Sequence, residues 1–283
     1  MSRRANPNSP SPRRGHAPEP VPSGLISTKE HRMFCEFADT VRSSRYIGLC
    51  YGPPGVGKTL SAEDYARWPE QRPFVEMPHP IVDWFHRGAN RSDWHTLLYT
   101  PLVNTPPGRA LTELTVMSNR HAMLRARHIE DPRRETNLHG ASSYTELVII
   151  DEAERLTTRA LEQVRDFYDR SALGLILIGM PGIEKRLARY PQLYSRIGFV
   201  HHYRTLTIEE LTTVLSTAFA HLGLASPDAT EAIAAIARTT AGNFRLVNRL
   251  LNQAERILKL NNLDLVTAEV IDAARDALVI GTS

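Results

Sequence analysis

One stretch decides the fold class of this 283-residue chain: Gly52-Pro53-Pro54-Gly55-Val56-Gly57-Lys58-Thr59. A short apolar run, residues 46–51, precedes it, and a segment with helical character, residues 60–68, follows it. A strand, a glycine-rich turn and a helix in this order form a loop whose backbone N–H groups surround a phosphate chain. The N-terminus of the helix adds a favourable partial positive charge. In this pattern Lys58 is placed to meet the β- and γ-phosphates of a nucleotide, and the Thr59 hydroxyl to ligate Mg²⁺.

Composition places the chain among ordinary globular proteins, with 42% apolar and 23% charged residues. Its two cysteines, Cys35 and Cys50, provide neither a disulfide framework nor a metal-ligand cluster. No apolar run reaches the length of a transmembrane helix, and no apolar signal-peptide core follows Met1. We therefore expect a cytoplasmic protein without a membrane partner.

The net charge of +3 comes from the N-terminal tail. Residues 1–24 contain six prolines, four arginines and one glutamate, so residues 25–283 are neutral overall. Such a composition cannot form a packed core and predicts a disordered basic tail. Two functions are open for this tail: a solubilising leader, or a basic arm that contacts DNA phosphates or a partner.

Hydrophobic patterns predict a parallel α/β domain over residues 25–206 and a small helical domain over residues 207–283. In the first region, Leu147–Ile150 and Leu173–Gly179 are apolar runs typical of buried parallel strands. Further strands are expected at residues 72–77, 94–100 and 199–203, and helices at residues 30–41, 111–124 and 156–170. From residue 207 onward, four helical patterns follow one another without a strand.

Two carboxylates, Asp151 and Glu152, stand directly after the apolar strand Leu147–Ile150. Carboxyl ends of parallel strands meet at one edge of a sheet, so both residues are expected beside the glycine-rich loop. Asp151 can hold Mg²⁺ through water or together with Thr59. Glu152 can polarise a water molecule for attack on the γ-phosphate.

Two arginines occupy positions from which they could neutralise γ-phosphate charge. Arg196 lies in Leu193–Gly198, and Arg245 follows Gly242-Asn243-Phe244 at the start of a helix. One could act on the site of a neighbouring subunit and the other from the helical domain. On the pattern alone, a surface cation and an ordinary helix-start arginine are the simpler explanations.

Together these motifs resemble those of the AAA+ ATPases over roughly residues 25–280. The Walker A motif is then Gly52, Pro53, Pro54, Gly55, Val56, Gly57, Lys58 and Thr59, and the Walker B motif is Leu147–Glu152. Ser195-Arg196 resembles the arginine-finger box, and residues 242–245 resemble the sensor-2 motif with Arg245. The sensor-1 position departs from the family pattern, because it reads Gly179-Met180-Pro181-Gly182. The resemblance implies a P-loop core with a helical lid that hydrolyses ATP with Mg²⁺.

Within that family, the chain looks like the helper ATPases of transposons, of the TniB, TnsC and MuB type. The resemblance is carried by residues 46–59, 177–187 and 190–198. It implies ATP-dependent, largely sequence-independent binding of double-stranded DNA as a ring or helical filament. It also implies a transposase as partner, with or without a target-selection protein. A helicase loader, a replication initiator, a secretion-associated ATPase and a small-molecule P-loop kinase are the competing hypotheses.

Two basic regions are candidates for DNA contact. Residues 109–139 carry a net charge of +2 and residues 184–204 one of +4. The first is expected to face DNA, as in initiator-type members of the family, and the second serves a subunit interface equally well. A solvated charged face explains the first region as well as DNA binding does. The expected DNA contacts are Arg109, Arg120, Arg125 and Arg127.

Overall fold

The computed structural model describes residues 26–76, 93–103, 106–129 and 144–278. The predicted disordered tail, residues 1–24, lies outside the described residues. The same holds for part of the basic region 109–139. Outside these gaps, no helix combines the length and the apolar character needed to cross a membrane.

Five parallel strands form one sheet in the order β2-β3-β4-β1-β5. Their bounds are Ile47–Tyr51 (β1), Thr96–Tyr99 (β2), Leu147–Ile150 (β3), Gly174–Gly179 (β4) and Ile197–His202 (β5). The central strands β3 and β4 are buried along their whole length, as expected for a parallel sheet with helices on both faces. All five strands point the same way, so the loops that follow them gather at one edge of the sheet.

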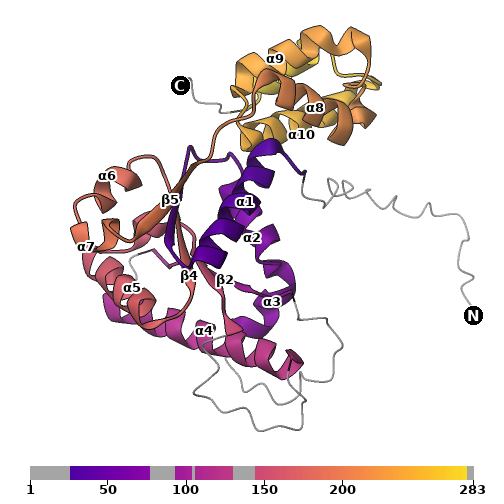
Figure 1. Ribbon diagram of the computed structural model, residues 1–283. Helices are drawn as coiled ribbons and strands as arrows, with labels where there is room; N and C mark the ends of the chain where they lie inside the picture. Colours follow the sequence, from indigo (N-terminus) through magenta and orange to yellow (C-terminus); the bar gives the residue numbers. More distant parts are fainter. Residues whose placement is uncertain (1–25, 77–92, 104–105, 130–143, 279–283) are drawn as a thin grey trace, which may run out of the picture.

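In the described part of the chain, seven α-helices surround this sheet; Figure 1 shows their arrangement. α1 contacts β1, β4 and β5, whereas α4 packs against β2 and α5. Thr28 and Thr157 cap the N-termini of α1 and α5 through their side chains. The bounds are Lys29–Ser44 (α1), Lys58–Tyr65 (α2), Trp68–Val75 (α3), Pro107–Ile129 (α4), Thr158–Arg170 (α5), Ile183–Leu187 (α6) and Pro191–Tyr194 (α7).

The helical region that follows β5 has a hydrophobic core of its own, built around Leu215, Ile236, Leu250 and Ile271. Figure 1 shows it beyond one edge of the sheet, beside the start of α1. Its helices are Ile208–Ala218 (α8), Thr230–Thr240 (α9), Phe244–Asn261 (α10) and Ala268–Asp276 (α11), with short 3₁₀ turns at 220–222 and 227–229. The predicted fold class, a parallel α/β core with a helical C-terminal region, is confirmed.

The predicted strand at residues 72–77 is wrong, because residues 72–75 belong to helix α3; residue 77 lies outside the described residues. Pro69 occupies the first turn of the helix. A proline is tolerated there because the backbone N–H groups of the first turn have no intrahelical carbonyl acceptor, so the missing N–H of proline costs no hydrogen bond. The fully buried Gln71 donates from its side-chain amide to the carbonyl groups of Ala66 and Thr96. Tertiary packing of this turn overrides the strand preference of Phe74 and Val75.

Candidate active site

The glycine-rich loop lies between β1 and α2 and requires its glycines. Gly55 and Gly57 have φ angles of 79° and 111°, a region that side chains with a Cβ rarely adopt. A Cβ added at Gly52 would lie 2.1 Å from the carbonyl oxygen of Tyr203. The Lys58 ammonium donates to the carbonyl oxygens of Gly52 (2.6 Å) and Pro53 (2.7 Å), so it lies inside the loop. Burial lowers the pKa of Lys58.

Thr59 and Asp151 meet at the carboxyl edge of the sheet, as the motif spacing predicts. The Thr59 hydroxyl donates to Asp151 Oδ2 at 2.6 Å, and Asp151 Oδ1 accepts from the backbone N–H of Glu152 at 2.9 Å. Hydroxyl and carboxylate oxygens are the ligands that Mg²⁺ prefers. Among the described residues, no group of three or more His, Cys, Asp or Glu could hold a metal ion. A cation at this pair would therefore share its remaining ligands with phosphate and water.

Glu152 has a left-handed backbone, with a φ of 50°. Its carboxylate forms an ion pair with Arg155, whose guanidinium also donates to the carbonyl oxygen of Pro101 at 2.9 Å, just after β2. Such backbone conformations cost on the order of 1 kcal/mol in a residue with a Cβ and gather at functional sites. The turn directs the Glu152 carboxylate toward the end of β2 while Asp151 stays beside Thr59.

Gly179, at the expected sensor-1 position, has no room for a side chain. A Cβ there would lie 2.5 Å from Ile183 Cδ1 and 3.0 Å from Glu154 Oε2. The Glu154 carboxylate thus lies where a side chain of residue 179 would have to lie. Its Oε2 is buried and lacks a hydrogen-bond partner among the described residues. A larger side chain at residue 179 would therefore require Ile183 and Glu154 to move.

The start of α10 contacts the glycine-rich loop directly. The Asn243 side-chain amide donates to the Pro54 carbonyl at 2.8 Å, and the Arg245 backbone N–H donates to the Gly55 carbonyl at 2.9 Å. Arg245 lines a pocket of about 330 Å³ together with Lys58, Thr59, Asp151, Glu152 and Glu154. The structure therefore brings three sequence motifs together: the loop, the pair of carboxylates and the helical-region arginine.

A larger pocket of about 620 Å³ adjoins the first and shares Gly57 and Phe244 with it. Its floor holds a polar network in which the Ser61 hydroxyl lies 3.0 Å from His31 Nδ1 and 2.9 Å from the Tyr203 hydroxyl. Burial lowers the pKa of His31, which favours the neutral imidazole. The remaining lining is largely apolar and comes from Ile26, Val56, Leu60, Phe219 and other side chains. Sequence reasoning missed this pocket, because its walls come from segments far apart in the chain.

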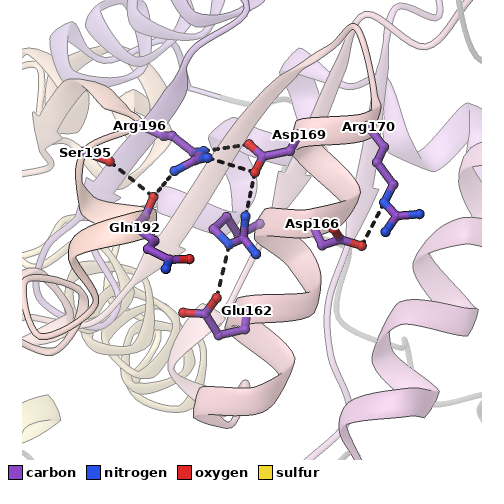
Figure 2. A network of polar contacts seen from close by, with 8 residues as sticks. Glu162, Asp166, Asp169, Arg170, Gln192, Ser195 and Arg196 are labelled. Atoms are coloured by element: carbon purple, nitrogen blue, oxygen red, sulfur yellow. Dashed lines mark hydrogen bonds and ion pairs between the residues drawn. The ribbon is translucent and has the colours of Figure 1, made fainter.

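Arg196 does not join these residues. It immediately precedes β5, and its carbonyl oxygen accepts from the N–H of Ile47 at the start of β1. The glycine-rich loop follows the end of β1, so Arg196 lies at the opposite edge of the parallel sheet. Its guanidinium is paired with Asp169 near the end of α5 (Figure 2).

The four arginines expected to contact DNA all lie on α4. Arg125 is wrong for that role, because it is 7% exposed and bonded to the Tyr144 carbonyl and to Glu146 at 2.8 Å. Arg109 is exposed and pairs with Glu113 on the next turn, whereas Arg120 donates to the Val75 carbonyl. The side chain of Arg127 lies outside the described residues. A charge count along α4 could not separate structural arginines from exposed ones.

Comparison with known proteins agrees with this geometry. The family model described as an AAA domain matches residues 41–187. A "Potential ATP-binding protein" of Staphylococcus aureus is 39% identical over 275 residues, which cover 91% of this chain and 97% of the relative. The Mu-like prophage FluMu DNA transposition protein B of Haemophilus influenzae is 23% identical over 180 residues, 61% of this chain and 54% of that protein.

Among solved structures, the RuvB Holliday junction branch migration motor of Thermotoga maritima has a TM-score of 0.55 and 17% identity. This similarity covers 90% of the present chain and 71% of the motor, and it concerns the fold. The AAA-domain match spans more than half of the chain and includes the glycine-rich loop, Asp151 and Glu152. The chain therefore belongs to the AAA domain family and is an ATP-hydrolysing P-loop enzyme.

Proposed function

We propose that this protein is an ATP-dependent regulator of DNA transposition that assembles on target DNA and recruits or activates a transposase. The observation that carries this proposal is its similarity to a DNA transposition protein B over 180 residues. The resemblance of residues 46–59, 177–187 and 190–198 to transposon helper ATPases agrees with it. We propose that DNA binding is largely independent of sequence, through arginines of α4 such as the exposed Arg109, because a guanidinium is suited to phosphates.

In the proposed reaction, each group of the smaller pocket has one task. The substrate phosphates replace the two carbonyl groups that now accept from Lys58, whose charge stabilises them. Thr59 and Asp151 would hold Mg²⁺, which would compensate the charge of the phosphates. Glu152 orients the attacking water and accepts its proton, once its carboxylate leaves Arg155. The larger pocket, with its apolar wall and neutral His31, suits the nucleobase.

The two remaining arginines belong to different protomers in this proposal. Arg245 acts on the nucleotide of its own chain, because it lines the same pocket as Lys58. Arg196 is at the other edge of the sheet and serves the site of a neighbour. An interface of this kind joins unlike surfaces, so repetition produces a ring or a helical filament. ATP at each interface then controls assembly on duplex DNA, which Arg109, Arg120 and Arg127 are proposed to contact.

The decisive experiment measures binding to a labelled DNA duplex by fluorescence anisotropy, with ATP, with a non-hydrolysable analogue and without nucleotide. We expect nucleotide-dependent binding that Lys58→Ala abolishes, since the phosphates lose their main cation. Lys259→Ala is the matched control, because this exposed lysine of α10 pairs only with Glu255 on its own helix among the residues described. Binding by Lys58→Ala equal to that of wild type would contradict the proposal.

Assembly and partner choice need two further measurements. Glu152→Gln should form filaments or rings on DNA that persist with ATP, visible by negative-stain electron microscopy, because hydrolysis no longer disassembles them. A transposase encoded next to this protein should become more active in strand transfer when ATP-bound protein occupies the target duplex. Exclusive binding to single-stranded DNA would instead favour the helicase-loader alternative.

A further inference from the structure

The ion pair between Arg196 and Asp169 joins the start of β5 to α5 (Figure 2). Arg196 Nε donates to Asp169 Oδ1 at 2.6 Å, and Nη2 donates to Oδ2 at 2.9 Å. Two parallel hydrogen bonds of this kind fix the plane of a guanidinium as well as its position. A third bond, from Nη1 to the Gln192 carbonyl, holds the group from α7.

These three bonds leave part of the guanidinium free. The group has five N–H donors, and Nε–H, one N–H of Nη2 and one of Nη1 are used. One N–H on each terminal nitrogen therefore has no partner among the described residues. The Arg196 side chain is 33% exposed, so its unpaired donors are accessible to a ligand from outside the chain. A held cation with two free donors is suited to a phosphoryl oxygen pair.

Asp169 is itself held in place on α5. Arg165, one turn earlier, donates to Asp169 Oδ2 at 2.6 Å and to Glu162 at 3.1 Å (Figure 2). Hydrogen bonding to Arg196 lowers the pKa of Asp169, so the carboxylate is charged near neutral pH. The Arg196 guanidinium is thus oriented by a carboxylate that has little freedom of its own.

Further bonds connect this pair to the opposite end of α5. The Thr158 hydroxyl lies 2.7 Å from the Tyr190 hydroxyl, just before α7. Arg186 of α6 donates to the carbonyl groups of Glu154 (2.8 Å) and Leu156, in the turn that follows the carboxylates of the active site. Two contacts on α5, at Thr158 and Asp169, and the bonds of Arg186 to the turn before α5 therefore join this part of the chain to the segment that ends at Arg196.

We propose that Asp169 is the positioning residue of Arg196: it presents the two free N–H donors to the nucleotide bound by a neighbouring protomer. Through α5, the position of Arg196 follows the turn after Asp151 and Glu152, so one ATP site influences the next. This inference rests on the proposed function, specifically on the action of Arg196 in the site of a neighbour. Asp169 touches no nucleotide and acts only through Arg196.

The first test compares Asp169→Asn with Asp166→Asn in a steady-state ATPase assay with duplex DNA. Asp166 is a matched control, because it also pairs with an arginine of α5, Arg170, at 2.9 Å, and makes no contact with Arg196 (Figure 2). An arginine acting on a γ-phosphate is worth about 10³–10⁵ in kcat. Its misplacement should lower kcat about 10- to 100-fold in Asp169→Asn, with an unchanged KM for ATP. Asp166→Asn should keep the wild-type kcat, and a wild-type kcat for Asp169→Asn would overturn the proposal.

The second test separates positioning from mere stability by mixing variants. Glu152→Gln protomers bind ATP and assemble but have an inactive site and an intact Arg196, whereas Asp169→Asn protomers have an intact site. We expect the mixture to hydrolyse ATP faster than either variant alone, because mixed interfaces pair an intact site with a well-placed Arg196. A purely structural role for Asp169 would give no gain on mixing and would refute the inference. If Asp169→Asn unfolds at the assay temperature, Asp169→Glu, which retains the charge, replaces it.

A parallel mixture of Arg196→Ala with Glu152→Gln tests the premise. If this mixture gains no activity, Arg196 does not act on a neighbour and the proposed assembly itself is wrong. If it gains activity while the Asp169→Asn mixture does not, only the positioning role is wrong. The two failures are therefore distinguishable.

Discussion

Replacing His121 should make the protein markedly more resistant to acid. His121 lies on α4, is 0% exposed, and its Nδ1 is 2.8 Å from the Thr145 hydroxyl just before β3. Burial, together with the nearby charges of Arg125 and His95, lowers the pKa of His121 to about 3. Between the pKa of His121 in the folded state and its pKa in the unfolded state, the ring is therefore neutral in the folded protein and protonated in the unfolded chain.

The size of the effect follows from this interval. The unfolded-state pKa is 6.5 and the folded-state pKa is about 3, so the unfolded chain binds more protons between these values. The free energy of unfolding is therefore highest, as far as His121 is concerned, above pH 6.5, and it decreases as the pH falls toward 3. Each unit below the unfolded-state pKa costs about 1.4 kcal/mol. Between pH 7 and pH 5, His121 alone should therefore remove about 2 kcal/mol of the free energy of unfolding.

The assay is urea-induced unfolding of wild type and His121→Gln at pH 7 and pH 5. Glutamine is of similar size and can bond Thr145, but it does not titrate. The variant should lose about 2 kcal/mol less than wild type between the two pH values. His221→Gln, at an exposed position, should behave as wild type. Equal losses in wild type and His121→Gln would refute the assignment of acid sensitivity to this residue.

Two further predictions concern packing near the active site. Arg204→Ala should lower the free energy of unfolding, measured by urea titration, by about 2–3 kcal/mol. The reason is that it leaves the 2% exposed carboxylate of Glu30 without its guanidinium partner. A loss of about 0.5 kcal/mol or less, typical of exposed pairs, would contradict this prediction. Gly179→Ser should lower stability by about 1–3 kcal/mol without raising kcat, because its Cβ would collide with Ile183. Gly108→Ser, which has open space around its Cβ, is the control in thermal unfolding, and equal melting temperatures would count against the steric argument.

The sequence was sufficient to predict those parts of the fold and site that depend on backbone requirements. The loop requires positive φ angles at Gly55 and Gly57, so the spacing of these glycines in the sequence predicts the loop. The apolar run Leu147–Ile150 can only be a strand buried on both faces, and the carboxylate after it must lie at the carboxyl edge. The hydrogen bond between Thr59 and Asp151 joins residues 92 positions apart, yet both motifs mark this edge in advance.

Contacts that depend on the packing of side chains left no such trace. Asp169 is 27 residues from Arg196, and nothing in its neighbourhood distinguishes it from Asp166. In the sequence, Arg125 is one more positive charge in a basic segment, whereas in the folded protein it is buried and forms an ion pair with Glu146. The positive charges of a segment can be counted from the sequence, but the exposure of each side chain depends on how the helices pack.

The contact between the start of α10 and the glycine-rich loop has a kinetic consequence. The N–H of Arg245 and the side chain of Asn243 both donate to loop carbonyl groups, so the helical region closes over the nucleotide pocket. We expect the release of ADP and the entry of ATP to require the loosening of these two bonds. We therefore expect the dwell time of the nucleotide to match the interval between successive openings of the helical region. The hydrogen bonds of Asn243 and Arg245 to the loop would then set the rate of nucleotide exchange.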